Sequence, residues 1–111
     1  MELKYKRILL KLSGEALAGE KKSGFDETVI ASICGGIRKA HDQGVQIGIV
    51  VGGGNFWRGR SSGKMDRMDA DKIGMLATVM NALAVKDALR QQGVPAVVMT
   101  SAVMPQVAET F

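Results

Sequence analysis

Cysteine and histidine each occur once in this chain of 111 residues, as Cys34 and His41. A single cysteine excludes an intrachain disulfide, and neither residue has the companions that a zinc site requires. We therefore expect both to be ordinary helix residues, and we predict no metal site.

Long hydrophobic runs are also missing. No window approaches the roughly 18 apolar residues of a membrane span. The apolar run near the start is interrupted by Lys11 and is not followed by the small-residue cleavage site of a secretory signal. These absences predict a cytoplasmic protein that has no membrane partner.

Aromatic residues are scarce, at 5% of the chain, and they do not interleave with the basic residues. The formal net charge of +4 owes much to Lys4, Lys6, Arg7 and Lys11, which only Glu2 opposes in that stretch. A basic flank of this kind is typical of a solvated surface, whereas a base-stacking surface needs aromatic side chains. We expect no nucleic-acid partner.

The hydrophobic content of 46% is sufficient for one modest core. We therefore expect residues 1–111 to form a single lobe. The final residues, "SAVMPQVAETF", carry neither a helix stop nor a polar tail. For this reason we expect the chain to be a truncated part of a longer domain.

The apolar pattern predicts alternating strands and helices. A helix is expected between Asp26, a plausible N-cap, and Gly44, a plausible C′ residue. Gly35 and Gly36 weaken this helix and indicate either close packing against a sheet or a kink. The other expected elements are a buried strand at Arg7–Leu12, a strand at Val45–Val51, a helix from about Ala70 to Gln92 closed by Gly93, and a strand at Pro95–Met99. This order predicts an α/β fold with a parallel sheet and right-handed crossovers.

Two unusual features follow the first two expected strands, and in a parallel sheet both fall at one edge, where ligands bind. The first strand ends in "KLSG", with Lys11 and Ser13, and the second ends in the triplet Gly52–Gly54. Glycine backbone can direct successive N–H groups at a phosphate, and Lys11 would add a positive charge. Alternatively, the glycines make only a tight turn and Lys11 extends into solvent.

The common phosphate motifs are absent, because neither the Walker pattern nor Gly-x-Gly-x-x-Gly fits the glycine-rich stretch. Arg58 follows the triplet closely enough to clamp a phosphate, but it could equally be a surface arginine. Asp66, Asp69 and Asp71 all fall near the start of the long helix, where carboxylates are favourable for dipole reasons alone. From the residues alone, no choice among the three is possible.

Three segments, "KLSGEAL", "VVGGGNFWRG" and "DKIGMLATVMNALAVKDAL", together resemble bacterial uridylate kinases, members of the amino acid kinase superfamily. The resemblance extends from about Lys6 to Phe111. It implies a three-layer α/β sandwich with a mainly parallel sheet, of which this chain would be the amino-terminal half. It also implies transfer of the γ-phosphoryl group of ATP, with Mg²⁺, to UMP.

The resemblance further implies roles for individual residues. Lys11 would be catalytic and offset transition-state charge, while Gly53 and Asp71 would bind UMP, Asp71 through the ribose. The ATP contacts would be Lys11, Leu12, Ser13, Gly14, Gly54 and Arg58. In this interpretation the glycine triplet lets donor and acceptor phosphates approach one backbone segment.

Regulation and assembly are implied in the same way. The family is hexameric, activated by GTP and inhibited by UTP. The segment aligned with GTP activation is Gly19, Glu20, Lys21, Lys22, Ser23 and Gly24, although its lysines depart from the expected pattern. The family's second half supplies the adenine pocket, so we expect this chain alone to be inactive. The alternatives are another superfamily member, acting on a carboxylate or carbamate, and a non-catalytic structural or nucleotide-binding lobe.

Overall fold

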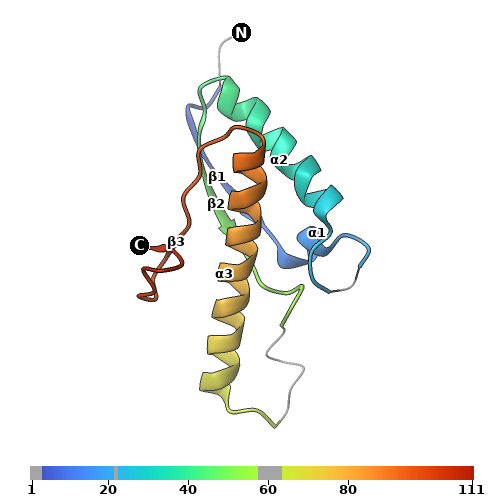
Figure 1. Ribbon diagram of the computed structural model, residues 1–111, viewed down its shortest axis with the longest axis vertical. Coiled ribbons are helices and arrows are strands. Elements are labelled where there is room, and N and C mark those ends of the chain that lie inside the picture. Colours follow the sequence, from blue (N-terminus) through green and yellow to red (C-terminus); the bar gives the residue numbers. More distant parts are fainter. Residues whose placement is uncertain (1–3, 22, 58–63) are drawn as a thin grey trace.

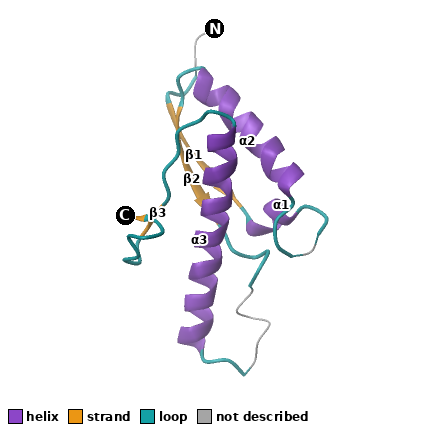
Figure 2. Ribbon diagram, viewed as in Figure 1, coloured by secondary structure: helices purple, strands orange, loops and turns teal. Residues whose placement is uncertain are grey.

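A computed structural model of the chain describes residues 4–21, 23–57 and 64–111 (Figure 1). Figure 2 shows its helices and strands, which are β1 (Arg7–Leu12), α1 (Gly14–Ala18), α2 (Glu27–Asp42), β2 (Gln46–Val51), α3 (Arg67–Gln91), β3 (Met99–Thr100) and β4 (Glu109–Thr110). The expected α/β class is confirmed, and the five-residue helix α1 is an addition that the sequence pattern did not predict.

Strands β1 and β2 form the expected parallel pair, with Arg7 opposite Gln46 and Leu12 opposite Val51. Their side chains alternate between exposed and inward-facing positions, so β1 is only half buried, and Leu9 is 76% exposed. Helices α2 and α3 pack on the inward face (Figure 1). Among the described residues, helices cover only this inward face of the sheet, so the sheet and its helices form two of the three expected layers.

The helix ends follow local rules. The Asp26 carboxylate accepts hydrogen bonds from the N–H groups of Thr28, at 3.0 Å, and Val29, at 3.3 Å, which confirms the expected N-cap of α2. Gly44 and Gly93 follow the two long helices with φ values of 92° and 82°, as expected for C′ residues. Helix α3 begins at Arg67, earlier than the apolar pattern predicts, because Arg67, Met68 and Asp69 are all exposed and present no inward-facing apolar side chain.

The glycine pair inside α2 is not explained by close packing. A Cβ atom on Gly36 would meet nothing within 4 Å, and one on Gly35 would meet only the Gln92 side-chain oxygen, at 3.8 Å. The close-packing interpretation of this pair is therefore wrong, since an alanine would fit at either position.

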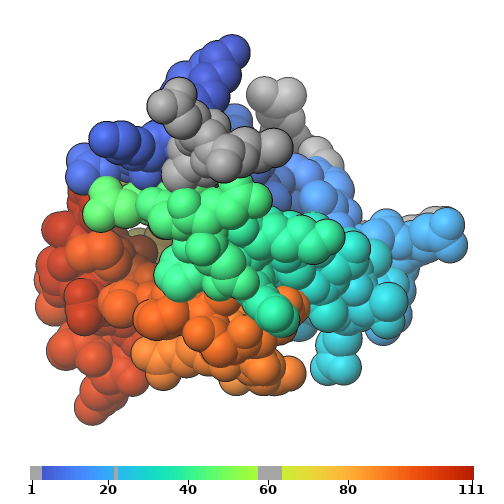
Figure 3. All heavy atoms as spheres, turned by 90° about the horizontal axis from the view of Figure 1, so that it is seen from above, coloured from blue at the N-terminus to red at the C-terminus, as the bar shows by residue number. Residues whose placement is uncertain are grey.

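The prediction of a third strand at Pro95–Met99 is wrong. Strand β3 begins only at Met99 and pairs with β4 in a separate parallel ladder. Residues of β2, of α3 and of the segment 94–100 line a cavity of about 750 Å³, and Figure 3 shows the C-terminal segment beside α3. This segment packs beside α3 instead. Val94 is buried in the apolar core, and the Arg90 guanidinium donates to the Ala96 carbonyl at 3.1 and 3.3 Å.

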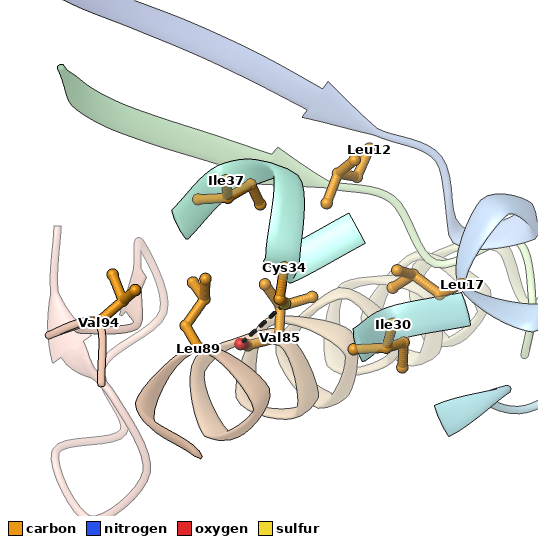
Figure 4. Close-up of a cluster of buried hydrophobic side chains, with 8 residues drawn as sticks. All are labelled: Leu12, Leu17, Ile30, Cys34, Ile37, Val85, Leu89 and Val94. Atoms are coloured by element: carbon orange, nitrogen blue, oxygen red, sulfur yellow. Dashed lines mark hydrogen bonds between the residues drawn. The ribbon is translucent and has the colours of Figure 1, made fainter. Parts of the chain in front are cut away.

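One apolar cluster joins the sheet to α1, α2 and α3 (Figure 4). Cys34 lies in it, fully buried, with its Sγ 3.9 Å from the Val85 carbonyl oxygen, and burial raises the pKa of its thiol. The other members are Leu12, Leu17, Ile30, Ile37, Val85, Leu89 and Val94. Cys34 and His41 both lie in α2, as expected of helix residues. In the described ranges, none of the helices has the length and apolar character needed to cross a membrane.

Candidate functional site

The carboxyl ends of β1 and β2 meet at one edge, as predicted for parallel strands. Leu12 is the register partner of Val51, and the N–H of Gly52 donates to the Leu12 carbonyl at 2.9 Å. The two features that the sequence analysis singled out, "KLSG" and the glycine triplet, therefore continue side by side from the sheet. The glycine-rich part of the candidate site is built on this edge.

Gly14 and Gly54 are in close contact there. A Cβ atom on Gly14 would stand 2.5 Å from the backbone nitrogen of Gly54 and 2.9 Å from that of Asn55. A Cβ atom on Gly54 would overlap the carboxylate of Glu15. Neither glycine has a positive φ, so backbone conformation does not require glycine here; Gly14 must lack a side chain because it contacts backbone, whereas the Glu15 carboxylate beside Gly54 is the end of a flexible side chain. Sequence reasoning missed this loop-to-loop packing.

Gly53 faces α3. A Cβ atom on Gly53 would stand 2.9 Å from the Ala77 Cβ, 3.2 Å from the Gly74 carbonyl oxygen and 3.3 Å from the Thr78 nitrogen. In the part of the chain that the structure describes, the N–H groups of Gly53 and Gly54 donate to no backbone acceptor. Two adjacent N–H groups in this state are suited to an anion.

Asp71 is on α3, one turn before the point where Gly53 packs. It precedes Gly74 by three residues and Thr78 by seven, a spacing that puts these positions on one side of a helix. Asp69 precedes Gly74 by five residues and is turned away from that side, while Asp66 is the N-cap residue and makes no side-chain capping bond. Asp71 is exposed, so its carboxylate is accessible.

The residues of "KLSG" differ in what they offer a ligand. Lys11 is exposed on the outer face of β1, opposite Val50. The Leu12 side chain is buried in the core, so a ligand could reach only its backbone. The Ser13 hydroxyl accepts from the N–H of Ala16, at 3.2 Å, and thereby caps α1.

The segment predicted to be regulatory runs from Gly19 to Gly24 and reaches the same edge. Gly24 donates its N–H to the Asn55 carbonyl, at 3.0 Å, and the Asn55 amide donates back to the Gly24 carbonyl, at 2.9 Å. The Phe25 and Phe56 rings then meet edge to face, with centroids 5.1 Å apart. Glu20, Lys21 and Ser23 are exposed, and the predicted site residues Lys22 and Arg58 lie outside the described residues.

Two buried asparagines beneath the glycine triplet were not predicted. Asn55 and Asn81 are 2% and 0% exposed, and their amides donate to each other at 3.0 and 2.7 Å. The Asn81 amide also donates to the Gly52 carbonyl, at 2.6 Å. The available signal was a single amide in the apolar stretch "ATVMNALAV", where the helical pattern calls for a core residue.

Known proteins resemble this chain over nearly its whole length. Residues 6–109 match the model of the amino acid kinase family. The chain is 55% identical to the uridylate kinase of Pediococcus pentosaceus over 112 aligned positions, which cover 99% of this chain and 46% of that protein.

Solved structures give the same result. The UMP kinase from Bacillus anthracis matches with a TM-score of 0.89 and 38% identity, over 96% of this chain and 45% of that one. A carbamate kinase from Giardia lamblia, solved bound to AMP-PNP, matches with a TM-score of 0.59 and 16% identity, over 87% of this chain and 39% of that one, which shows a shared fold alone. The chain spans about half the length of the curated relatives it matches. With nearly its whole length matched by the family model, the chain belongs to the amino acid kinase family.

Proposed function

We propose that the gene product containing these residues is a UMP kinase, which transfers the γ-phosphoryl group of ATP to UMP and releases UDP and ADP. The observation that carries the proposal is the convergence of Gly14 and Gly54 at the carboxyl edge of the sheet, in a chain 55% identical to a uridylate kinase. The carbamate kinase likeness is much weaker, with a TM-score of 0.59 against 0.89 for the UMP kinase, which disfavours a carbamate acceptor.

Lys11 and the backbone at Ser13, Gly14 and Gly54 serve the ATP side. An oxygen of the UMP phosphate attacks the γ-phosphorus while the bond to the β–γ bridging oxygen breaks, so negative charge builds up on the leaving ADP and on the transferred group. Fixed N–H groups and a lysine ammonium stabilise that charge without having to reorganise. This chemistry depends on positioning and charge, and it requires no nucleophilic side chain from the protein. Arg58 adds a guanidinium for a phosphate, and the Leu12 backbone completes the ATP contacts.

Gly53 and Asp71 serve the UMP side. The N–H of Gly53 approaches the acceptor phosphate, and the Asp71 carboxylate accepts hydrogen bonds from the ribose hydroxyls. Support comes from their positions, since Gly53 packs against α3 one turn beyond Asp71 and the carboxylate is exposed. Donor and acceptor would thus meet across adjacent glycines.

Mg²⁺ would enter with ATP. The described residues contain no group of three or more histidine, cysteine, aspartate or glutamate side chains that could hold a metal ion. Mg²⁺ in kinases is commonly held by substrate phosphates and water together with few protein ligands, and this edge fits that use. When bound, the ion would neutralise phosphate charge.

Regulation and assembly follow the same family pattern. The enzyme is a cytoplasmic homohexamer, activated by GTP through Gly19–Gly24 and inhibited by UTP. Support for the regulatory segment is its two-way hydrogen bonding to Asn55. Support for self-association is an apolar stripe on α3, where Ile73, Leu76 and Met80 are all at least 37% exposed. Residues 1–111 alone are inactive, because they span under half of the relatives' length.

The test is ADP formation from Mg·ATP by the complete gene product, with UMP, CMP, carbamate, glutamate and acetylglutamate offered separately. Turnover with UMP, well above the other acceptors, is the expected result. Preference for carbamate or a carboxylate would replace the proposal with another kinase of the family. Absence of turnover with every acceptor would leave a structural or nucleotide-binding protein. The chain 1–111 assayed in parallel tests whether it is inactive alone.

A further inference from the structure

The amides of Asn55 and Asn81 form a closed hydrogen-bonding unit. Each side chain donates one N–H to the other amide and its second to a backbone carbonyl, that of Gly24 for Asn55 and that of Gly52 for Asn81. All four amide hydrogens are therefore used, at donor–acceptor distances between 2.6 and 3.0 Å. Such a unit has one geometry in which every donor is satisfied.

Burial makes that geometry demanding. With Asn55 2% exposed and Asn81 fully buried, water cannot replace a lost partner. Neighbouring buried positions on α3 are apolar, including Ala77, Val79 and Val85. An apolar residue at position 81 would satisfy packing alone, so the pair of amides indicates a task beyond filling the core.

The unit connects three segments that meet at the candidate site. Asn81 belongs to α3 and holds the carbonyl of Gly52, the first residue of the triplet. Asn55 follows the triplet directly and holds Gly24. Between these two attachments lie Gly53 and Gly54, whose N–H groups face no backbone acceptor among residues 4–21, 23–57 and 64–111.

We propose that Asn55 and Asn81 are positioning residues. They fix the position of the Gly53–Gly54 backbone relative to α3, so that its N–H groups meet the phosphates. The inference rests on the proposed phosphoryl transfer for its ligand, but its structural claim does not. A shift of about 1 Å in a group that orients a substrate can cost on the order of 100-fold in rate. The amides act through the glycine backbone and touch no substrate themselves.

The test uses Asn81→Ala, Asn55→Ala and the double variant in the complete gene product. Asn81→Asp is added because it keeps the shape but loses the donors to Gly52 and Asn55. Val85→Ala is the matched control, because Val85 is buried one turn further along α3 and belongs to the core cluster. Circular dichroism at the assay temperature establishes that each variant is folded, and Asn55→Ala, which changes a loop residue, remains available if a variant of α3 does not fold.

The expected result is a fall in kcat/KM for ATP of at least about tenfold in each asparagine variant, with the double variant no worse than the poorer single one, as for two residues in one unit. Val85→Ala should lower the melting temperature to a similar degree with less than about a threefold change in kcat/KM. Asparagine variants that lose only as much activity as Val85→Ala would overturn the proposal.

Hydrogen exchange separates this inference from the proposed function. The amide of Gly52, which donates to the Leu12 carbonyl, should exchange faster in Asn81→Ala, and its exchange should be unchanged in Val85→Ala, whether or not the protein phosphorylates UMP. If the unsubstituted protein is inactive, the kinase proposal fails, while the exchange result still decides whether the amides hold the triplet. Unchanged exchange in Asn81→Ala would overturn the positioning claim by itself.

Discussion

A Cβ atom on Gly14 would stand 2.5 Å from the backbone nitrogen of Gly54, so the loops that follow β1 and β2 touch each other directly. Real Cβ atoms do not approach backbone this closely, and the contact can exist only because residue 14 is glycine. Protein packing therefore accounts for Gly14, a glycine that the sequence analysis assigned to phosphate. The same packing brings Ser13 and the triplet together before any ligand binds.

The first prediction concerns this contact. Gly14→Ala should lower the free energy of unfolding by about 1–3 kcal/mol, because the added methyl group must displace the Gly54 or Asn55 backbone. UMP-dependent ADP formation should fall as well, since the two loops are forced apart. Urea unfolding and the kinase assay measure the two effects. A variant with normal stability and normal turnover would contradict the packing argument.

A second prediction concerns Lys11. Lys11→Ala should reduce kcat on the order of 100-fold, the scale observed when one preorganised donor is removed from a charged transition state. The KM for UMP should change by less than about threefold, because the lysine serves the transferred group rather than the acceptor. Arg7→Ala is the control, since Arg7 is an exposed cation on the same strand and hydrogen-bonds to Gln46 at 2.8 Å. Equal losses of kcat in the two variants would show that Lys11 is not catalytic.

A third prediction concerns Asp71, whose substitution should change KM rather than kcat. Asp71→Ala should raise the KM for UMP about tenfold with little change in kcat, because a ribose contact exists in both the bound and transition states. Asp69→Ala is matched to it, as an exposed carboxylate on the same turn of α3 that is turned away from Gly53. Steady-state kinetics with varied UMP decides the matter. A larger effect on KM in Asp69→Ala than in Asp71→Ala would show that Asp69, and not Asp71, contacts the ribose.

The fold was predictable from sequence wherever local chemistry decides it. Asp26 caps the start of α2, and Gly44 and Gly93 follow the last turns of α2 and α3, as short-range capping rules require. The strand expected at Pro95–Met99 failed for a different reason. Its apolar residues predict burial, but they do not reveal which element buries them. Here the apolar cluster that includes α3 buries Val94, and the Arg90 guanidinium takes the place of a strand partner for the Ala96 carbonyl.

The sheet edge at which the candidate site lies was predictable from the sequence, but the buried side chains that hold its backbone were not. Parallel strands place Ser13 and the triplet together whatever the tertiary detail, so the topology was sufficient. Asn55 and Asn81 are 26 residues apart, and nothing in either local sequence names the other as a partner. Long-range amide pairs of this kind are found only when the fold is known, because the choice of partner is made by tertiary packing.

A fourth prediction uses two glycines with open surroundings. A Cβ atom would meet nothing within 4 Å at either Gly36 or Gly44, but Gly44 has a φ of 92° whereas Gly36 lies inside α2. Gly36→Ala should therefore raise the free energy of unfolding by about 0.5–1 kcal/mol. Gly44→Ala should lower it by about 1 kcal/mol, because an alanine is strained there. Denaturant unfolding tests both, and stabilisation by both would refute the conformational reason.

The last prediction is a pH dependence that comes from Cys34. Burial raises the pKa of the Cys34 thiol above its ordinary value, so in alkaline solution the folded protein retains a proton that the unfolded chain releases. Because the folded state then binds more protons, the free energy of unfolding falls as pH rises above the ordinary thiol pKa, and it is unaffected below it. Urea unfolding from about pH 7 to about pH 10 should show this decline across the ordinary range of thiol titration. Cys34→Ala supplies the control: it carries a constant cavity cost but has no thiol to titrate, so its stability should fall less steeply over the same interval. Parallel curves for the two proteins would mean that the thiol does not contribute, and that other groups set the alkaline limit of stability.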